Sequence, residues 1–191
     1  KNLFTSVGYH HRYFDIIEKV REIMKDKKIG LIRGKYFGGV PGEGKKIWLI
    51  KKNQSGGQLI EQATHVVDLM RYLMGDVEEV YACSFEGINK KLYPEYDVED
   101  ASITCMKFKN GTIGNLTCTW LWYGFFSDIE IVGKEFLIRW EGNTITAEYP
   151  NKKITYISEI DPMLEEDKAF INAVRSRDSS YIKCDYVEGL K

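Results

Sequence analysis

Features that define whole classes of protein are scarce or missing in this sequence. Its 191 residues include only 4 prolines and 4 cysteines, and no apolar run approaches the roughly 20 residues of a membrane span. No charged and then apolar leader of the secretory type is present. The 27 basic and 28 acidic residues nearly cancel and are spread along the chain, so no concentrated patch for nucleic acid or a membrane is expected. We therefore expect a soluble protein with neither partner.

The cysteines exclude two further kinds of site. Cys83, Cys105, Cys118 and Cys184 lie far apart and form no C-x-x-C pair, which argues against a disulfide framework or a zinc site. At least two alternate inside strand-like runs, so we interpret them as reduced core thiols of a cytoplasmic protein. With 43% hydrophobic residues, the chain is expected to form one large domain with a sizeable core.

The most informative stretch is SGGQLIEQATHVVDLMRYLMG, residues 55–75. Two glycines precede what the spacing predicts to be one amphipathic helix. The side expected to be buried carries Leu59, Ala63, Val66, Met70 and Leu73, and the side expected to face solvent carries Glu61, His65, Asp68 and Tyr72.

Glu61 and His65 are the candidate chemical pair of this helix. Because they are four residues apart, we expect their side chains to be neighbours. A carboxylate beside an imidazole suits proton transfer, and His65 would be the working group because its usual pKa is about 6.5. The alternative is an ordinary solvated helix face. We interpret Asp68 as structural, paired with Arg71 or Arg12.

Two segments before this helix are candidates for ligand contact. Gly56 and Gly57 allow an electron-rich ligand to approach the unpaired N–H groups at the helix start, although a simple tight turn is the alternative. The glycine-rich loop over residues 38–46 precedes Trp48, which is available to stack on a sugar or ring. This loop is either a lid or an ordinary surface excursion.

The rest of the chain predicts mainly strands. We expect a strand from residue 3, a four-turn helix within residues 10–30 stopped by Gly30, and a strand over 29–40 whose Gly30 and Gly34 indicate a bulge or close backbone approach. Alternating runs at 77–87 and 101–122, the second with an Asn110-Gly111 hairpin turn, and four short strands within 127–158 follow. A helix capped by Asp161 and a further helical start near residue 184 close the chain.

These elements predict an α+β fold: a large, mostly antiparallel, open-faced sheet of seven to nine strands with helices on one face. So few helices leave the other face uncovered. We expect that face to pack against a second copy in a homo-oligomer. A self-contained sandwich is the alternative.

The glycine pair, the acid-x-x-x-His-x-x-Asp helix, DASITCMKFKNGTIGNL and the terminal AFINAVRSRD together resemble the C-terminal domain of the Gfo/Idh/MocA family. These are relatives of glucose-fructose oxidoreductase and inositol dehydrogenase. The resemblance implies a dihydrodipicolinate-reductase-like fold that follows a Rossmann domain, which binds NAD or NADP and carries a catalytic lysine in an E-K-P motif. Neither G-x-G-x-x-G nor E-K-P occurs in residues 1–191. We therefore expect one domain, truncated at both ends and inactive alone.

The resemblance also implies roles for individual residues. It matches the family's active-site acid, commonly an aspartate, to Glu61 and its histidine to His65. A sugar or cyclitol hydroxyl would lose its proton to a base formed by His65 and the missing lysine, while hydride passes to the nicotinamide. The candidate substrate contacts are Arg12, Tyr9 and Trp48, and the candidate cofactor contacts are Gly56 and Gly57.

Three other interpretations stay open. The chain could be a non-catalytic domain that binds a carbohydrate and drives assembly, or part of a redox-neutral NAD-dependent enzyme that cleaves glycosidic bonds. A metal site of Glu61, His65 and either His10 or His11 is the third. His10 and His11 otherwise have no motif support.

Overall fold

One curved sheet of eight strands organises the computed structural model, which describes residues 3–191, with backbone alone at residues 43 and 44. The order across the sheet is β2-β3-β4-β1-β5-β6-β7-β8. Neighbours run antiparallel except β1 and β4, which are parallel. The strands are β1 (Ile29–Gly39), β2 (Val77–Phe85), β3 (Ala101–Phe108), β4 (Ile113–Thr119), β5 (Leu121–Gly133), β6 (Phe136–Glu141), β7 (Thr144–Tyr149) and β8 (Lys152–Ile157).

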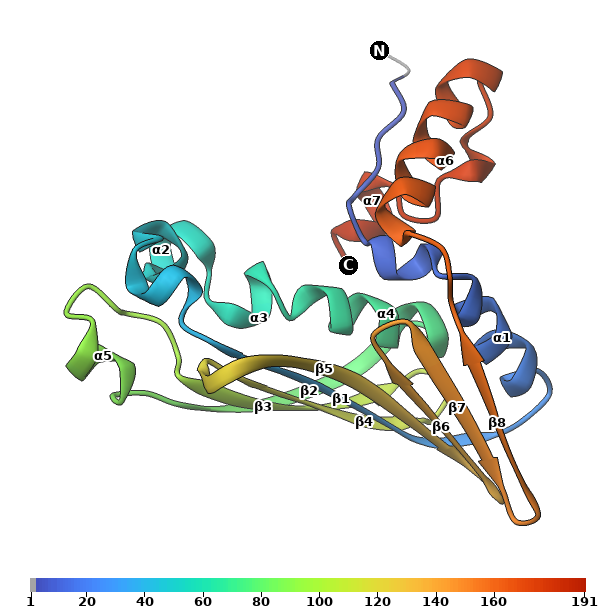
Figure 1. Ribbon diagram of the computed structural model, residues 1–191, viewed down its shortest axis with the longest axis horizontal. Helices are drawn as coiled ribbons and strands as arrows, with labels where there is room; N and C mark the ends of the chain where they lie inside the picture. The colour runs from blue at the N-terminus through green and yellow to red at the C-terminus, as the bar shows by residue number, and fades with distance from the viewer. Residues whose placement is uncertain (1–2) are drawn as a thin grey trace.

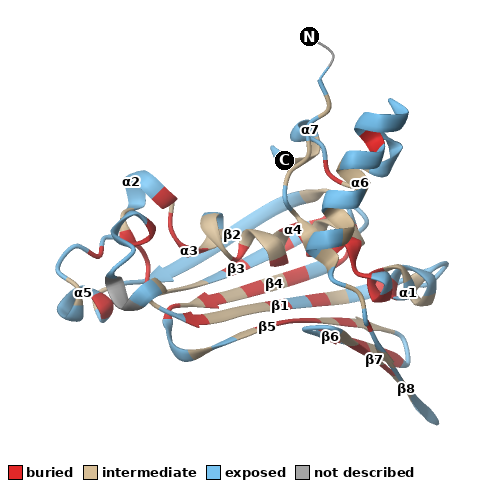
Figure 2. Cartoon of the chain, turned by 45° about the horizontal axis from the view of Figure 1, so that its top comes forward, coloured by how far each residue is buried: buried red, intermediate tan, exposed pale blue. Residues whose placement is uncertain are grey.

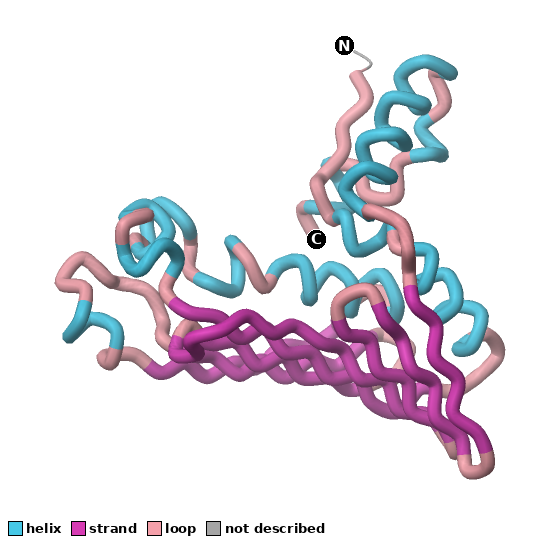
Figure 3. The backbone as a smooth tube through the Cα atoms, viewed as in Figure 1, coloured by secondary structure: helices cyan, strands magenta, loops and turns pink. Residues whose placement is uncertain are grey.

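The helices lie on one side of this sheet (Figure 1). Helix α4 crosses the sheet near its middle. Helices α6 and α7 and the start of the chain form a separate group above α1 in this view (Figure 3). The helical elements are η1 (His10–Tyr13), α1 (Asp15–Met24), η2 (Pro41–Gly44), η3 (Ile47–Ile50), α2 (Lys52–Ser55), α3 (Gln58–Glu61), α4 (Thr64–Met74), α5 (Asn89–Leu92), α6 (Pro162–Ser176), η4 (Ser179–Tyr181) and α7 (Tyr186–Gly189).

The predicted α+β class, with an open and mostly antiparallel sheet, is confirmed. The β3–β4 hairpin turns at Asn110-Gly111, where Gly111 has φ +86° and Asn110 Oδ1 accepts a hydrogen bond from the Thr112 N–H. Four strands follow Trp120 as expected. The Asp161 side chain caps α6 by accepting from two backbone N–H groups.

The core lies between α1, α4 and the face of the sheet beneath them. Ile17, Val66 and Met70 are buried there together with strand residues such as Ile32. Gly34 allows α4 to come close, because a Cβ at this position would lie 2.8 Å from Val66 Cγ1 and 2.9 Å from Met70 Sδ. The predicted close approach at Gly34 is therefore made by helix side chains, and the β1–β5 register shifts at Gly30.

Several sequence predictions are wrong in detail. No strand begins at residue 3. The first helix ends at Met24 rather than at Gly30: Lys25 already has an extended ψ of 131°, and Asp26 follows with a left-handed φ of 59°. Cys83 and Cys105 are exposed instead of lying in the core, since both point to the uncovered face of the sheet. Cys118 and Cys184 are buried as expected.

The face of the sheet opposite the helices is uncovered in this chain. Figure 2 shows the outer strands β2 and β8 as mostly exposed, whereas buried segments recur along β4 and β1. Large exposed apolar side chains on this face include Tyr81, Ile103 and Ile113. Within residues 3–191, no helix is both long and apolar enough to cross a membrane.

Candidate active site

His65 lies in the first turn of α4 and packs against the segment around η1. Its ring centroid is 6.0 Å from that of Tyr9, 4.9 Å from that of His10 and 5.5 Å from that of His11. The Nδ1 atom is buried and has no hydrogen-bond partner. Burial, followed by the charge of His10, lowers the pKa of His65 to about 4. At neutral pH the ring is therefore an uncharged imidazole, the form that accepts a proton.

All 3 histidines of the chain meet at this point. The rings of His10 and His11 are 4.4 Å apart, and His11 also packs edge-on against Trp140 of β6 at 4.9 Å. Burial lowers the pKa of His11 to about 3. Burial also lowers the pKa of His10, where the charge of Asp161 acts in the opposite direction. Sequence reasoning considered His10 and His11 only as alternative metal ligands and did not place both rings beside His65; the available signal was the small number of histidines, two of them adjacent.

These rings are not arranged as a metal centre. In the part of the chain that the structure describes, no group of three or more His, Cys, Asp or Glu side chains could hold a metal ion. The alternative that joined Glu61 and His65 to a histidine of η1 has no support in this geometry.

Glu61 is the last residue of α3 and has a different set of neighbours. Its Oε2 atom is buried without a hydrogen-bond partner, and burial raises the pKa of its carboxyl group against the influence of Gln62 and Lys46. Burial and then the Glu61 charge raise the pKa of Tyr36 of β1 to about 12. Among the described residues, no hydrogen bond or ion pair joins Glu61 to His65.

A break in the helix separates Glu61 from His65. Gln62 has φ −120° and ψ −51°, and the N–H of Ala63 donates to the carbonyl of Gln58, five residues back. The prediction of one continuous helix after Gly57 is therefore wrong, and the spacing of four between Glu61 and His65 does not correspond to one helical turn.

Two glutamines at this break, the first residue of α3 and the residue that follows it, are anchored to the sheet. Gln58 Nε2 donates to the carbonyl of Thr119 at 2.8 Å. Gln62 Oε1 accepts from the Tyr36 hydroxyl at 3.4 Å and from the Trp120 indole N–H at 3.3 Å. These contacts tie both ends of α3 to the sheet and to Trp120.

Arg12 is buried and bound to protein groups. Its Nε and Nη2 donate to the Asp68 carboxylate at 2.8 and 2.6 Å, and Nη1 donates to the carbonyl of Lys183 at 2.5 Å. Asp68 pairs with Arg12, which confirms one of its two predicted partners. The prediction that Asp68 faces solvent is wrong, because the residue is buried. Arg71 pairs instead with Asp76 and Glu188. Since every guanidinium nitrogen of Arg12 has a protein acceptor, we leave Arg12 out of the substrate contacts proposed below.

The glycine turn before α3 is filled by a protein carboxylate. Gly56 and Gly57 have φ +77° and +96°, which explains why glycine stands at both positions. A Cβ at Gly57 would lie 2.5 Å from Oε1 of Glu99, which is 6% exposed and pairs with Lys52 at 2.9 Å. A carboxylate here would repel a cofactor phosphate, and α3 is a helix of only 4 residues. We therefore propose no cofactor contact at this turn.

The remaining candidate residues lie on either side of this region. The Tyr9 hydroxyl shares a hydrogen bond of 3.0 Å with Oγ1 of Thr64, which ties Tyr9 to the residue before His65. Trp48 lies in η3 and is 49% exposed. The loop predicted before it is shorter than expected, because Gly38 and Gly39 belong to β1 and residues 41–44 form η2.

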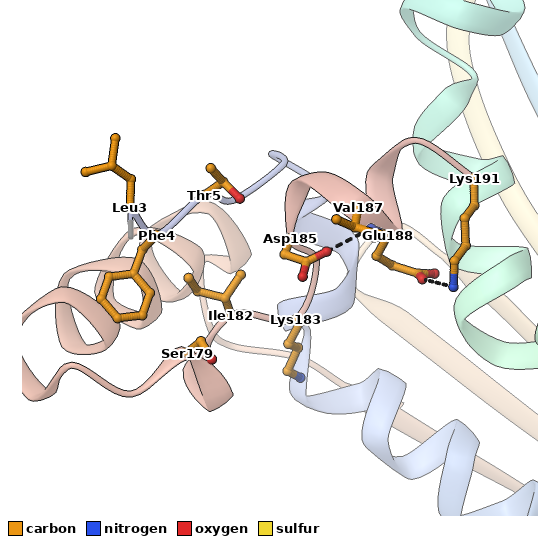
Figure 4. A pocket seen from close by; sticks show the side chains of 10 residues that line it. All are labelled: Leu3, Phe4, Thr5, Ser179, Ile182, Lys183, Asp185, Val187, Glu188 and Lys191. Carbon is orange, nitrogen blue, oxygen red and sulfur yellow. Dashed lines mark hydrogen bonds and ion pairs between the residues drawn. The ribbon is translucent and has the colours of Figure 1, made fainter. Parts of the chain in front are cut away.

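A cavity of about 470 Å³ lies elsewhere, between the first described residues and the end of the chain (Figure 4). Its lining includes Phe4, Ile182 and Val187, and an ion pair between Glu188 and Lys191 lies at one side. It contains none of the predicted site residues, so we do not assign the chemistry to it.

Comparisons with known proteins agree with this fold. Residues 17–139 match the family model described as the GFO/IDH/MocA C-terminal domain. The uncharacterized protein UNK4.17 of Schizosaccharomyces pombe is 28% identical over 97% of this chain and 52% of its own length. Myo-inositol 2-dehydrogenase of Thermotoga maritima is 30% identical over 64% of this chain and 40% of its own. The chain thus spans about half the length, or less, of these relatives.

Solved structures show the same fold. Levoglucosan dehydrogenase in complex with NADH and levoglucosan superposes with a TM-score of 0.84, covering 99% of this chain and 61% of that one at 22% identity. Because the family model matches well over half of the sequence, the chain belongs to the GFO/IDH/MocA oxidoreductase family as a C-terminal domain.

Proposed function

We propose that the chain is the substrate-binding and oligomerisation domain of an NAD- or NADP-dependent dehydrogenase that oxidises a sugar or cyclitol hydroxyl. The observation that carries the proposal is His65, an uncharged imidazole whose buried Nδ1 has no protein partner. Two relatives support the substrate class: one is named myo-inositol 2-dehydrogenase, and the other is a levoglucosan dehydrogenase solved with NADH and levoglucosan.

In this proposal His65 accepts the proton of the substrate hydroxyl as a general base. The lowered pKa keeps the ring in its uncharged form throughout the neutral range. Tyr9 and its hydrogen bond to Thr64 hold one side of the ring. The nicotinamide, bound by a separate Rossmann domain outside this chain, would supply the hydride acceptor.

Glu61 would bind a substrate hydroxyl rather than polarise His65. Its buried Oε2 lacks a hydrogen-bond donor, and an unpartnered buried acceptor costs free energy that a ligand O–H would recover. Trp48, exposed in η3, offers an apolar ring for stacking on the sugar. The two residues would thus set orientation, and His65 would carry the chemistry.

The uncovered face of the sheet would hold a second copy of the chain. Tyr81, Ile103 and Ile113 expose apolar surface there, which water-exposed sheets rarely retain. Beside them, Arg33 pairs with Glu130 at 3.2 Å across β1 and β5, so the face offers charges of both signs to a copy related by a two-fold axis.

Analytical ultracentrifugation tests this contact. The parent should sediment as a dimer or larger oligomer, and the Ile103→Glu variant as a monomer. The Ile171→Glu variant, changed on α6, should sediment like the parent. A parent that sediments as a monomer at all concentrations would contradict the proposed contact.

The enzymatic test is nicotinamide reduction by the full-length protein, followed by absorbance over a panel of sugars and inositols. We expect His65→Asn to lose most of the rate while it still folds and binds the sugar. Glu61→Gln should raise KM more than it lowers kcat. A His65→Asn variant as fast as the parent would remove His65 as the base.

Two other outcomes would select the other interpretations. If a glycoside is consumed without net nicotinamide reduction, the enzyme is redox-neutral. If a sugar binds and nothing on the panel reacts, the chain is a binding and assembly domain.

A further inference from the structure

Two of the three clustered histidines have no role in the function proposed above. We propose that His10 is a second proton-carrying residue of this site: it receives the proton that His65 takes from the substrate and passes it to solvent. The inference rests on the proposed function of His65 and adds the route by which His65 returns to its uncharged form before the next turnover.

His65 needs such an outlet because its surroundings disfavour a positive charge. The ring is packed by Tyr9, His10 and His11, and its Nδ1 is sealed from solvent without a hydrogen-bond partner. No carboxylate bonds to it among the described residues. A protonated His65 would therefore be held in a poorly solvated place with no compensating charge.

His10 is the better acceptor of the two neighbouring rings. It is closer to His65 in centroid distance, 4.9 Å against 5.5 Å for His11. His11 is enclosed by Phe14, Trp140 and His65, and its own Nδ1 is buried without a partner. Burial lowers the pKa of His11 to about 3, which disfavours a proton on this ring.

The charges around His10 favour a proton on it. Burial lowers the pKa of His10, and the backbone of Gly8 and then Asp161, at the N-terminus of α6, act against that lowering; no carboxylate acts in this way on His65. The Asp161 side chain accepts hydrogen bonds from the N–H groups of Met163 and Leu164, which stabilise its charged form. His11 and His65 are the titratable rings in contact with His10, and Glu166 of α6 lies beside the same segment, with Oε2 3.9 Å from a Cβ placed on Gly8.

The step involves a proton alone. An N–H bond breaks at His65 and one forms at His10, directly or through one water, and the His10 proton then passes to water or buffer. No electron leaves the substrate in this step, so it needs no co-reactant.

Rescue by small proton carriers tests the role of His10. In the full-length protein, we expect His10→Gln to lower kcat about tenfold in dilute buffer with little change in KM. Added imidazole should restore the rate in proportion to its concentration, because it replaces the missing carrier. The parent and His11→Gln should not respond to imidazole.

A His10→Gln enzyme as fast as the parent in dilute buffer, or one that imidazole does not restore, overturns the inference. A failure of the proposed function gives a different result from a failure of this inference. In that case the His65→Asn variant would reduce the nicotinamide as fast as the parent. Histidine NMR of the full-length protein gives an independent readout, with the ring signals of His10, His11 and His65 assigned by substituting each in turn. His10 should titrate at the highest pH of the three, and Asp161→Asn should lower its pKa; a lower pKa for His10 than for His65 overturns the inference.

Discussion

Arg12 and Asp68 lie 56 positions apart in sequence and form a two-point ion pair inside the protein, with N···O distances of 2.8 and 2.6 Å. Arg12 is 2% exposed and Asp68 3%. Because Arg12 belongs to η1 and Asp68 to α4, the pair fixes the segment that carries His10 and His11 against the helix that carries His65. The histidine cluster depends on this contact.

Asp68→Ala should lower the free energy of unfolding by about 3 to 5 kcal/mol, because it leaves the Arg12 guanidinium buried without its partner. Urea unfolding followed by circular dichroism measures the change. Glu22→Ala is the control, since Glu22 is exposed on α1 and forms a surface ion pair with Lys19. A loss as small as that of the control would contradict the structural role of the pair.

Gly34→Ala should destabilise the chain by about 1 to 3 kcal/mol, because the new methyl group would overlap Val66 and Met70 and force α4 away from β1. Gly38→Ala on the same strand is the matched control: the nearest atom to its Cβ, Trp120 Cδ1, is 3.8 Å away. Thermal unfolding of both variants against the parent tests the difference. Equal melting temperatures would show that α4 can move at little cost.

Glu166 should make the fold less stable at alkaline pH. Burial raises the pKa of its carboxyl group from 4.5 to about 7, and Oε1 has no hydrogen-bond partner. The stabilising contribution of the protonated form is complete below pH 4.5 and is lost as pH rises through 7. Glu166→Gln should therefore gain stability relative to the parent at pH 8 but not at pH 4.

The histidine cluster should cause the opposite pH dependence. The folded-state pKa values of His11 and His65, about 3 and 4, lie below the usual 6.5. Their contribution to stability is complete above pH 6.5 and is lost as pH falls through 4 and then 3. Urea unfolding at several pH values should show a smaller acid loss for His11→Gln than for the parent. Parallel pH profiles would mean that His11 titrates normally in the folded chain.

The sheet was predictable because its signals are local. Alternation of apolar and polar residues marks each strand, and turn residues separate them; Gly111 and Gly142 both adopt the positive φ that such turns require. The parallel pairing of β1 with β4 has no local signal, since it joins strands that other elements separate in the sequence.

The candidate site was predictable only in part. The histidine at position 65 stands in a recognisable motif, so it could be singled out. The break between Glu61 and His65 lies where two glutamines share hydrogen bonds with Thr119, Tyr36 and Trp120, which lie far away in the sequence. The position of His10 likewise depends on a long-range ion pair, and periodicity carries no information about either contact.

The place of β1 in the sheet has a consequence for the order in which the chain assembles during synthesis. β1 ends at Gly39, yet its two neighbours begin at Ile113 and Leu121. The middle of the sheet therefore cannot form until most of the chain has left the ribosome, and closing such long loops slows folding. Until then the apolar residues of β1 stay exposed, so this strand is where a nascent chain would most need protection from aggregation.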